Sequence, residues 1–184
     1  QLSHESLLAA EGAALRGHVP FGYAISTEVN PLPHAEDAAV IVVANQTCLS
    51  DVQIAALVSY AKKGGRLVCT GESGRYDEWN RQRHVNPLKD AVAKLPNVAW
   101  RDEADAAKIK YMTHIKYAIH RPAKGPGPLR ADLAKTGWKP SVEVVAAPET
   151  VFAQFKVAGA DVASVHFVNY EFLHPVKGVR LRLP

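Results

Sequence analysis

The stretch GGRLVCTGESGRYDEWNRQR, residues 64–83, decides the fold of this chain. Its two leading glycines can adopt the left-handed conformation that ends a helix. The apolar run Leu67–Cys69 lies between Gly65 and Gly71, a pattern typical of a short buried strand in a parallel sheet. Gly71 and Gly74 then allow the chain to turn tightly, and a polar loop follows. The stretch therefore predicts a helix end, a buried strand, a turn and a loop.

The preceding residues predict a helix and another strand. Ser50 and Gln53 have the spacing of a capping box at a helix start. One apolar face recurs at helical spacing in Ile54, Leu57, Val58 and Ala61. The β-branched run Val40–Ala44 predicts a strand. This alternation indicates an α/β fold with a flavodoxin-like, doubly wound parallel sheet. Such a sheet seldom begins with a helix, so we expect its first strand upstream of Gln1 in a parent protein.

Further elements follow from local patterns. We expect helices at 3–16, 88–94, 103–120 and 129–135, and strands at 21–25 and 98–100. After Pro140 apolar and polar residues alternate, which predicts antiparallel strands with one solvated face. The predicted domains are an α/β domain at 1–120 that lacks its first strand, a linker at 121–140, and a partial β-sandwich at 141–184.

Composition excludes several classes of function. The net charge is +4 and the basic residues are scattered, so no nucleic-acid partner is expected. Cys48 and Cys69 form no CxxC motif, and the eight histidines have no metal-ligand spacing, so we expect no metal and no cofactor. No segment is apolar enough to span a membrane, and the absence of a secretory signal favours a cytoplasmic location.

Polar residues follow two of the predicted strands. Ligands of doubly wound sheets bind at the carboxyl ends of the strands, so this rim is the candidate ligand site. Its candidate binding residues are Asn45, Gln46, Thr70, Gly71, Glu72 and Ser73.

Cys69 is the candidate catalytic nucleophile, because Cys69-Thr70-Gly71 resembles the nucleophile turn of class I glutamine amidotransferases. That turn begins with glycine where this chain has Leu67. The family also needs a His-x-Glu downstream of its cysteine, whereas the match here, His34–Glu36, lies upstream. A buried cysteine that packs as a small apolar residue is the favoured alternative.

The loop after the strand combines acidic and aromatic residues. Glu72, with Asp77 and Glu78, could supply paired carboxylates for acid–base chemistry, although a solvated acidic loop balanced by arginines is favoured. Tyr76 and Trp79 either anchor an interface or pack on their own domain. The interface candidates are Tyr76, Asp77, Glu78, Trp79 and Arg81.

The run from Val40 to Arg81 resembles the middle domain of β-galactosidases of glycoside hydrolase family forty-two type. The resemblance rests on a strand at 40–44, on Leu49-Ser50-Asp51, on Gly64-Gly65, on a strand at 67–70, and on Ser73-Gly74 followed by Asp77-Glu78. The tail VHFVNYEFLHPVKGVRLRLP resembles the start of the β-sandwich that follows in related hydrolases.

The resemblance implies a glutamine-amidotransferase-like module, the β-galactosidase trimerisation domain, which is non-catalytic and helps to oligomerise its parent enzyme. We therefore expect a structural module whose partners are its own copies or the remaining domains of a parent hydrolase. Two alternatives remain open. One is a small hydrolase or amidotransferase-like enzyme that uses Cys69, and the other is a module that binds carbohydrate or a small anion at the rim.

Overall fold

The computed structural model describes residues 2–102, 128–140, 142–148, 150–157, 163–169 and 175–183. The chain divides into two compact units. One comprises residues 1–8, 23–110 and 131–138, and the other comprises residues 9–22, 111–130 and 139–184. Each unit is described by itself below, within the residues given above.

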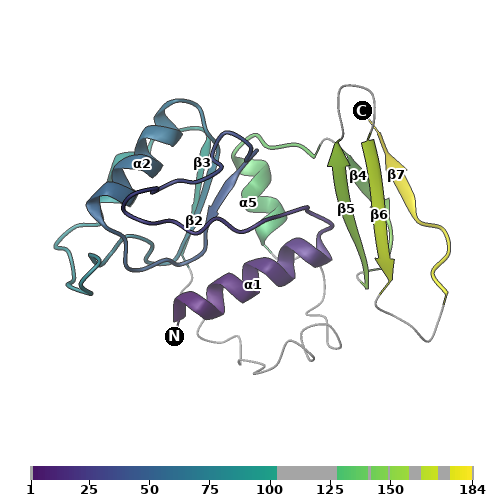
Figure 1. Ribbon diagram of the computed structural model, residues 1–184, viewed down its shortest axis with the longest axis horizontal. Helices are drawn as coiled ribbons and strands as arrows, with labels where there is room; N and C mark the ends of the chain where they lie inside the picture. The colour runs from purple at the N-terminus through teal and green to yellow at the C-terminus, as the bar shows by residue number, and fades with distance from the viewer. Residues whose placement is uncertain are drawn as a thin grey trace. The chain divides into compact units, whose positions relative to one another are not determined.

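Figure 1 labels the helices and strands other than α3 and β1. The helices are α1 (Leu2–Arg16), α2 (Asp51–Lys62), α3 (Pro87–Val92) and α5 (Leu129–Lys135). The strands are β1 (Ile41–Val43), β2 (Leu67–Thr70), β3 (Val98–Arg101), β4 (Glu143–Ala146), β5 (Val151–Val157), β6 (Ala163–Asn169) and β7 (Arg180–Arg182). None of the helices in the described part of the chain is long and apolar enough to cross a membrane.

The first unit contains a three-stranded parallel sheet in the order β1-β2-β3. The strands therefore lie in the sheet in the same order as in the sequence. Helix α2 connects β1 to β2, and helix α3 connects β2 to β3. In this register Cys69 of β2 lies between Val43 of β1 and Trp100 of β3. The prediction of an α/β fold with a parallel sheet is confirmed.

One face of this sheet packs against α2 and α3. Leu67 and Cys69 of β2 are completely buried in this core, because β2 is the central strand. The core consists of Val43, Leu49, Ile54, Leu57, Ala61, Leu67, Cys69, Leu88 and Val92. Every residue of β2 is buried, as expected of a parallel strand with both faces covered.

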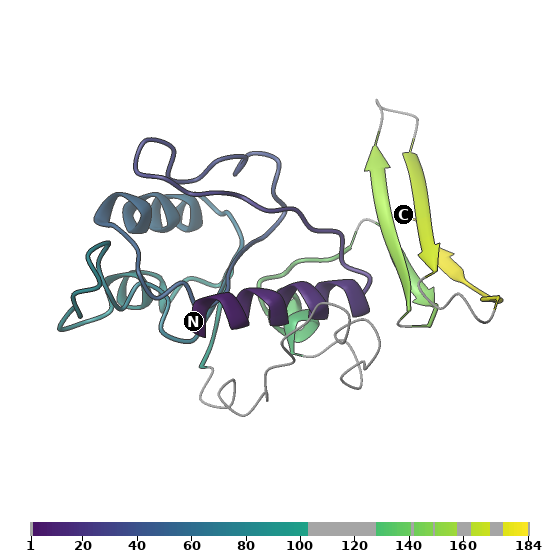
Figure 2. The same ribbon diagram turned by 60° about the horizontal axis from the view of Figure 1, so that its bottom comes forward.

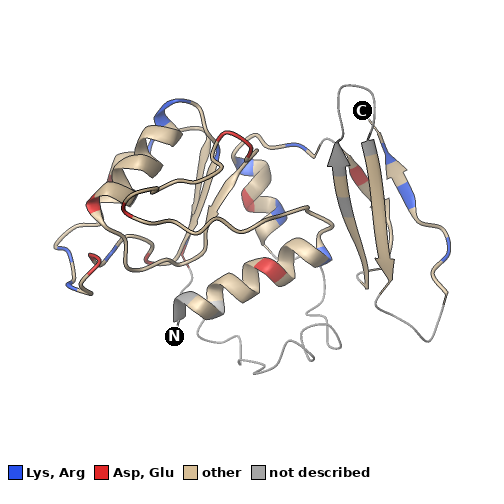
Figure 3. Cartoon of the chain, in the orientation of Figure 1, with Lys and Arg blue, Asp and Glu red and all other residues tan. Residues whose placement is uncertain are grey.

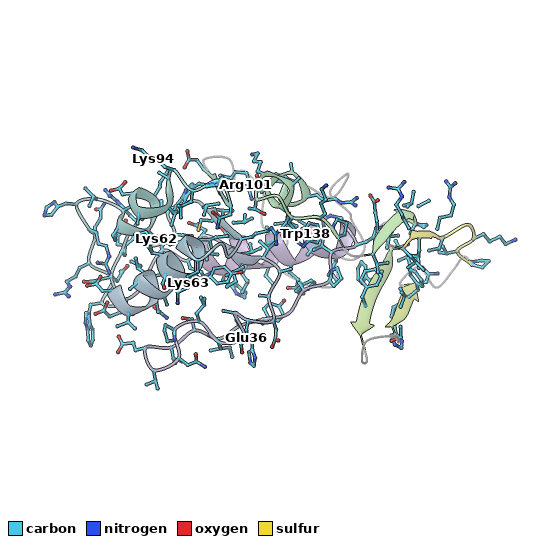
Figure 4. All side chains as sticks on the ribbon, turned by 90° about the horizontal axis from the view of Figure 1, so that it is seen from above. Glu36, Lys62, Lys63, Lys94, Arg101 and Trp138 are labelled. Carbon is cyan, nitrogen blue, oxygen red and sulfur yellow. The ribbon has the colours of Figure 1, made fainter. Side chains whose placement is uncertain are left out.

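The predicted ends of α2 are both present. The Ser50 hydroxyl accepts the N–H of Gln53, and the Gln53 side chain accepts the N–H of Ser50, which completes the capping box. At the other end Lys62 and Lys63 lie beside the last turn (Figure 4). Gly64 then ends the helix with φ of +95°, a conformation that glycine adopts without steric cost.

The end of β3 is linked to α5 by ion pairs to a buried carboxylate. Arg101 Nε lies 2.6 Å from Asp132 Oδ2, and Lys135 Nζ lies 3.2 Å from Asp132 Oδ1. Asp132 is almost fully buried, so these two cations supply the charge compensation that a buried carboxylate needs. The pair fixes α5 to the sheet.

The second unit contains two small antiparallel sheets. β5 and β6 form a hairpin with continuous register from Val151↔Asn169 to Val157↔Ala163, and its strands run side by side in Figure 2. β4 pairs with β7 across a register shift between Val144 and Ala146. The alternating pattern after Pro140 correctly predicted antiparallel strands, whereas the predicted sandwich stays a prediction.

One predicted strand is absent. Residues 21–25 belong to no sheet among the described residues, although they alternate apolar and small residues. Alternation predicts extended backbone, but a strand also needs a neighbour, and Ile25 is 83% exposed here. The helix predicted at 103–120 and the first part of the predicted linker, 121–127, lie outside the described residues.

Candidate functional site

The candidate site is the rim formed by the carboxyl ends of β1 and β2. These parallel strands end at the same edge, so the residues that follow them meet there. The N–H of Asn45 donates to Thr70 Oγ1 at 3.0 Å, and Asn45 Oδ1 accepts the N–H of Glu72 at 2.9 Å. Asn45 and Thr70 are both buried. The two strand ends are therefore joined by their own polar groups.

Gly71 lies directly against Asn45. Gly71 has φ of +57° and Asn45 has φ of +47°, so both residues adopt the left-handed conformation. A Cβ on Gly71 would overlap the Asn45 carboxamide oxygen and would lie 2.7 Å from its Cγ. The backbone of the turn consequently occupies the space at the end of β2.

Ser73 connects the loop that follows β1 to the loop that follows β2. Its side chain is completely buried, and its Oγ accepts the N–H of Gln46 at 3.1 Å. The same oxygen lies 2.8 Å from the carbonyl of Thr70 and 3.1 Å from that of Val43, and its single hydrogen serves one of them at a time. Asn86 donates to the Ser73 carbonyl at 2.9 Å. The hydroxyl is thus enclosed by backbone.

The candidate ligand residues therefore do converge, but mostly on one another. Gln46 donates its side-chain amide to the Ala44 carbonyl at 2.9 Å. The side chain of Glu72 is exposed, whereas its N–H is bound by Asn45. Hydrogen bonds within the chain engage the polar side chains of Asn45, Gln46, Thr70 and Ser73. At the rim, the polar groups that follow β1 and β2 are hydrogen-bonded to one another instead of facing an open site.

The two cysteines occupy different environments. Cys69 is completely buried in the core beneath α2 and α3, and burial raises the pKa of its thiol to about 12. Cys48 is an exposed free thiol whose Sγ lies 3.5 Å from Asn80 Oδ1. A nucleophilic cysteine needs its thiolate, which an apolar environment disfavours. The surroundings of Cys69 are those of a core residue.

The loop after the rim is a hydrogen-bonded turn that exposes Trp79. Asp77 Oδ1 accepts the N–H groups of Trp79 at 3.0 Å and Arg81 at 2.8 Å, and Asp77 Oδ2 accepts Arg81 Nε at 2.7 Å. Although burial tends to raise the pKa of the Asp77 carboxyl, these hydrogen bonds outweigh it and lower the pKa. Trp79 is 72% exposed at the tip, and Glu78 beside it is exposed.

Backbone contacts attach this turn to the rim. The N–H of Tyr76 donates to the Thr47 carbonyl at 2.9 Å, and the N–H of Leu49 donates to the Tyr76 carbonyl at 3.1 Å. Arg83 then binds Asp51 at 2.6 Å and the Leu49 carbonyl at 2.9 Å, at the start of α2. Tyr76 is half-buried, so Trp79 is the more exposed of the two aromatic interface candidates.

One described group could offer three ligands to a metal. The side chains of His34, Glu36 and Asp37 have potential ligand atoms within 4.8 Å of one another. All three are exposed, and a turn in which the Asp37 N–H donates to the His34 carbonyl brings them together. Exposed acidic groups of this kind are explained by solvation alone.

Sequence reasoning missed two residues that support the rim. Asn86 caps α3, since its Oδ1 accepts the Lys89 N–H at 3.0 Å, and its amide binds Ser73. The pair Asn86-Pro87 is a typical start of a helix and could have identified this cap. Asp132, which pairs with Arg101, carries no comparable sequence pattern.

The sequence matches no protein-family model and no curated protein. Its structure is similar to the crystal structure of the apo exo-carrageenase GH42 from Bacteroides ovatus, with a TM-score of 0.51 and 16% sequence identity. The match covers 89% of this chain and 20% of that chain, so the present chain spans about a fifth of the length of that enzyme. At this identity the likeness shows a related fold.

Proposed function

We propose that this chain is a non-catalytic structural and oligomerisation module of a β-galactosidase-like glycoside hydrolase. In this proposal the parallel sheet belongs to a flavodoxin-like, amidotransferase-like domain, and residues 141–184 begin a β-sandwich. The match to part of a family GH42 enzyme supports a relation to glycoside hydrolases. The chemistry and the substrate would then belong to other domains of the parent protein.

The closed rim is the observation that carries the proposal. An enzyme or a ligand-binding domain of this fold uses the strand ends as its site. Here Asn45, Thr70 and Ser73 use their polar groups to bind neighbouring loops, and a ligand would have to displace those bonds. The alternatives of a rim ligand site and of a Cys69 enzyme both require an opening at this point.

The exposed Trp79 supports a role in association. Large aromatic side chains held in place and surrounded by polar residues are typical anchors of protein interfaces. The hydrogen bonds of Asp77 hold the turn in one conformation, so little entropy is lost when Trp79 contacts a partner. We propose that this turn, residues 76–81, contacts another subunit.

Light scattering coupled to size-exclusion chromatography tests this role. We expect the purified chain to self-associate, and we expect Trp79→Ala to lower the mass of the assembly while the circular dichroism spectrum is unchanged. Val85→Ala is the control, because Val85 is 62% exposed and lies outside the turn. An assembly that Trp79→Ala leaves intact would remove the turn from the interface.

Thiol labelling tests the Cys69 alternative separately. We expect iodoacetamide at neutral pH to modify the exposed Cys48 and to reach Cys69 only in denaturant. Peptide mapping by mass spectrometry identifies the modified site. Rapid labelling of Cys69 in the folded protein would favour the enzyme over the structural module.

A further inference from the structure

Residues 26–38 of the first unit form a strap that runs beside α2, as the purple segment in Figure 2 shows. None of these residues, all of which the structure describes, is buried or belongs to a helix or strand. The strap contains acidic residues but no Lys or Arg, and Figure 3 accordingly shows red and no blue along it. Within the described part of the chain, no ion pair holds the strap to the rest of this unit.

Side chains attach the strap to the first unit. At its start, Gln53 Nε2 donates to Ser26 Oγ at 2.9 Å. At its end, the Tyr60 hydroxyl donates to the Ala38 carbonyl at 3.3 Å. Between these two bonds, the half-buried Leu32 packs against the apolar core of the sheet and α2. The strap is therefore held by two hydrogen bonds from α2 and by one partly buried apolar side chain.

Other hydrogen bonds of the strap lie within it. The N–H of Thr27 donates to the Asn30 carbonyl at 3.0 Å, and the N–H of Asn30 donates to Thr27 Oγ1 at 3.0 Å. Ser26 Oγ donates to the Pro31 carbonyl at 2.6 Å. The turn that begins at His34, described above, adds another bond of this kind. Such local bonds persist when a segment moves as a whole, whereas the contacts with α2 and the core do not.

We propose that the strap opens as a unit while the parallel sheet stays folded, and that Leu32 is the latch that keeps it closed. Free energies of local opening range from near zero to the global stability, and segments with few buried apolar contacts open first. Opening uncovers the apolar surface beneath Leu32 and leaves β1, β2 and β3 paired. This inference involves neither the rim nor the turn around Trp79.

Proteolysis in a Cys48→Ser background tests whether the strap opens separately from the sheet. A glutamate-specific endopeptidase cuts the strap after Glu36, and mass spectrometry measures the rate. Iodoacetamide labelling of Cys69 reports unfolding of the sheet, because this residue is completely buried. Over the first 1 M or so of urea, we expect strap cleavage to change less than about twofold and Cys69 labelling to rise at least about fivefold, because local opening exposes little surface.

Leu32→Ala tests the latch. When reclosing is faster than cleavage, the cleavage rate follows the population of the open form, so loss of this packed side chain should raise the rate after Glu36 about tenfold. Tyr60→Phe removes the bond to Ala38 and should raise the rate about threefold. Val29→Ala is the matched control and should leave the rate unchanged, because Val29 is a strap side chain that is 98% exposed.

The results separate three behaviours of the strap. Cleavage that is nearly independent of urea in the parent protein, and about tenfold faster in Leu32→Ala, supports separate opening. Cleavage that rises with urea as steeply as the labelling of Cys69 means that strap and sheet open together, which overturns the proposal. A cleavage rate that Leu32→Ala leaves unchanged means that the peptidase cuts the closed strap, and this result overturns the proposal as well.

Discussion

The carboxamide of Asn45 occupies the position that a side chain on Gly71 would need. Asn45 follows β1 and Gly71 follows β2, so this contact brings the two strand ends as close as a residue without Cβ allows. The same Asn45 oxygen accepts the N–H of Glu72, the residue after Gly71. This contact therefore joins the ends of β1 and β2, and it explains why position 71 is a glycine.

Gly71→Ala should destabilise the protein by about 2–4 kcal/mol, since it combines strained φ with displacement of Asn45. Urea denaturation measures the free energy of unfolding. Gly64→Ala is the control, because Gly64 also has positive φ, +95°, but a Cβ there meets no atom within 4 Å. Equal losses in the two variants would mean that Asn45 adjusts without cost.

Ser73→Ala should lower the free energy of unfolding by about 1–3 kcal/mol. The substitution leaves the partly buried N–H of Gln46 without its Ser73 acceptor and removes the donor to the buried Thr70 or Val43 carbonyl. Ser59→Ala, at an exposed position of α2, should change stability by less than about 0.5 kcal/mol. Similar values for both would contradict a structural role of the Ser73 hydroxyl.

Stability should fall with rising pH because of Cys69. Burial raises the pKa of its thiol from 9.0 to about 12, so between these values the unfolded chain releases a proton that the folded chain keeps. The unfolded state is then favoured by up to about 1.4 kcal/mol per pH unit. Cys69→Ala should reduce the slope of unfolding free energy against pH in this window. An unchanged slope in Cys69→Ala would contradict the burial argument.

Asp132→Ala should destabilise the first unit by about 2–4 kcal/mol, because it removes the almost fully buried carboxylate that binds both Arg101 and Lys135. Asp102→Ala removes a carboxylate that is 75% exposed and bound to Lys89, and should cost less than about 1 kcal/mol. Thermal unfolding with limited proteolysis around α5 measures both effects. A smaller loss for Asp132 than for Asp102 would mean that the buried pair contributes nothing net.

The parts of the fold that sequence predicted are those with local causes. The Ser50 capping box, the apolar face of α2 and the glycine that ends it each depend on residues a few positions apart. The meeting of Asn45 with Thr70 followed from a general property of parallel strands. The pairing of Arg101 with Asp132 joins residues 31 positions apart without any repeating pattern, so it needed the structure.

The strand predicted at residues 21–25 was wrong because a strand depends on a neighbour that is distant in the sequence. Residues 21–25 have the alternation of a strand, but the neighbour that would make them one is a property of the whole fold. The closed state of the rim was also beyond sequence, because the same polar residues could face a ligand or one another. Only the hydrogen-bond partners of these side chains, which the structure gives, distinguish an open ligand site from a closed rim.

The order β1-β2-β3 in space repeats the order of synthesis. Each strand of this sheet can therefore dock on its predecessor as the chain leaves the ribosome, without waiting for a later part of the chain. β4 has to wait for β7, since Glu143 pairs with Arg182 near the end of the chain. Until β7 has been synthesised, β4 lacks its pairing partner, so during that interval its backbone edge is open to pairing with other chains.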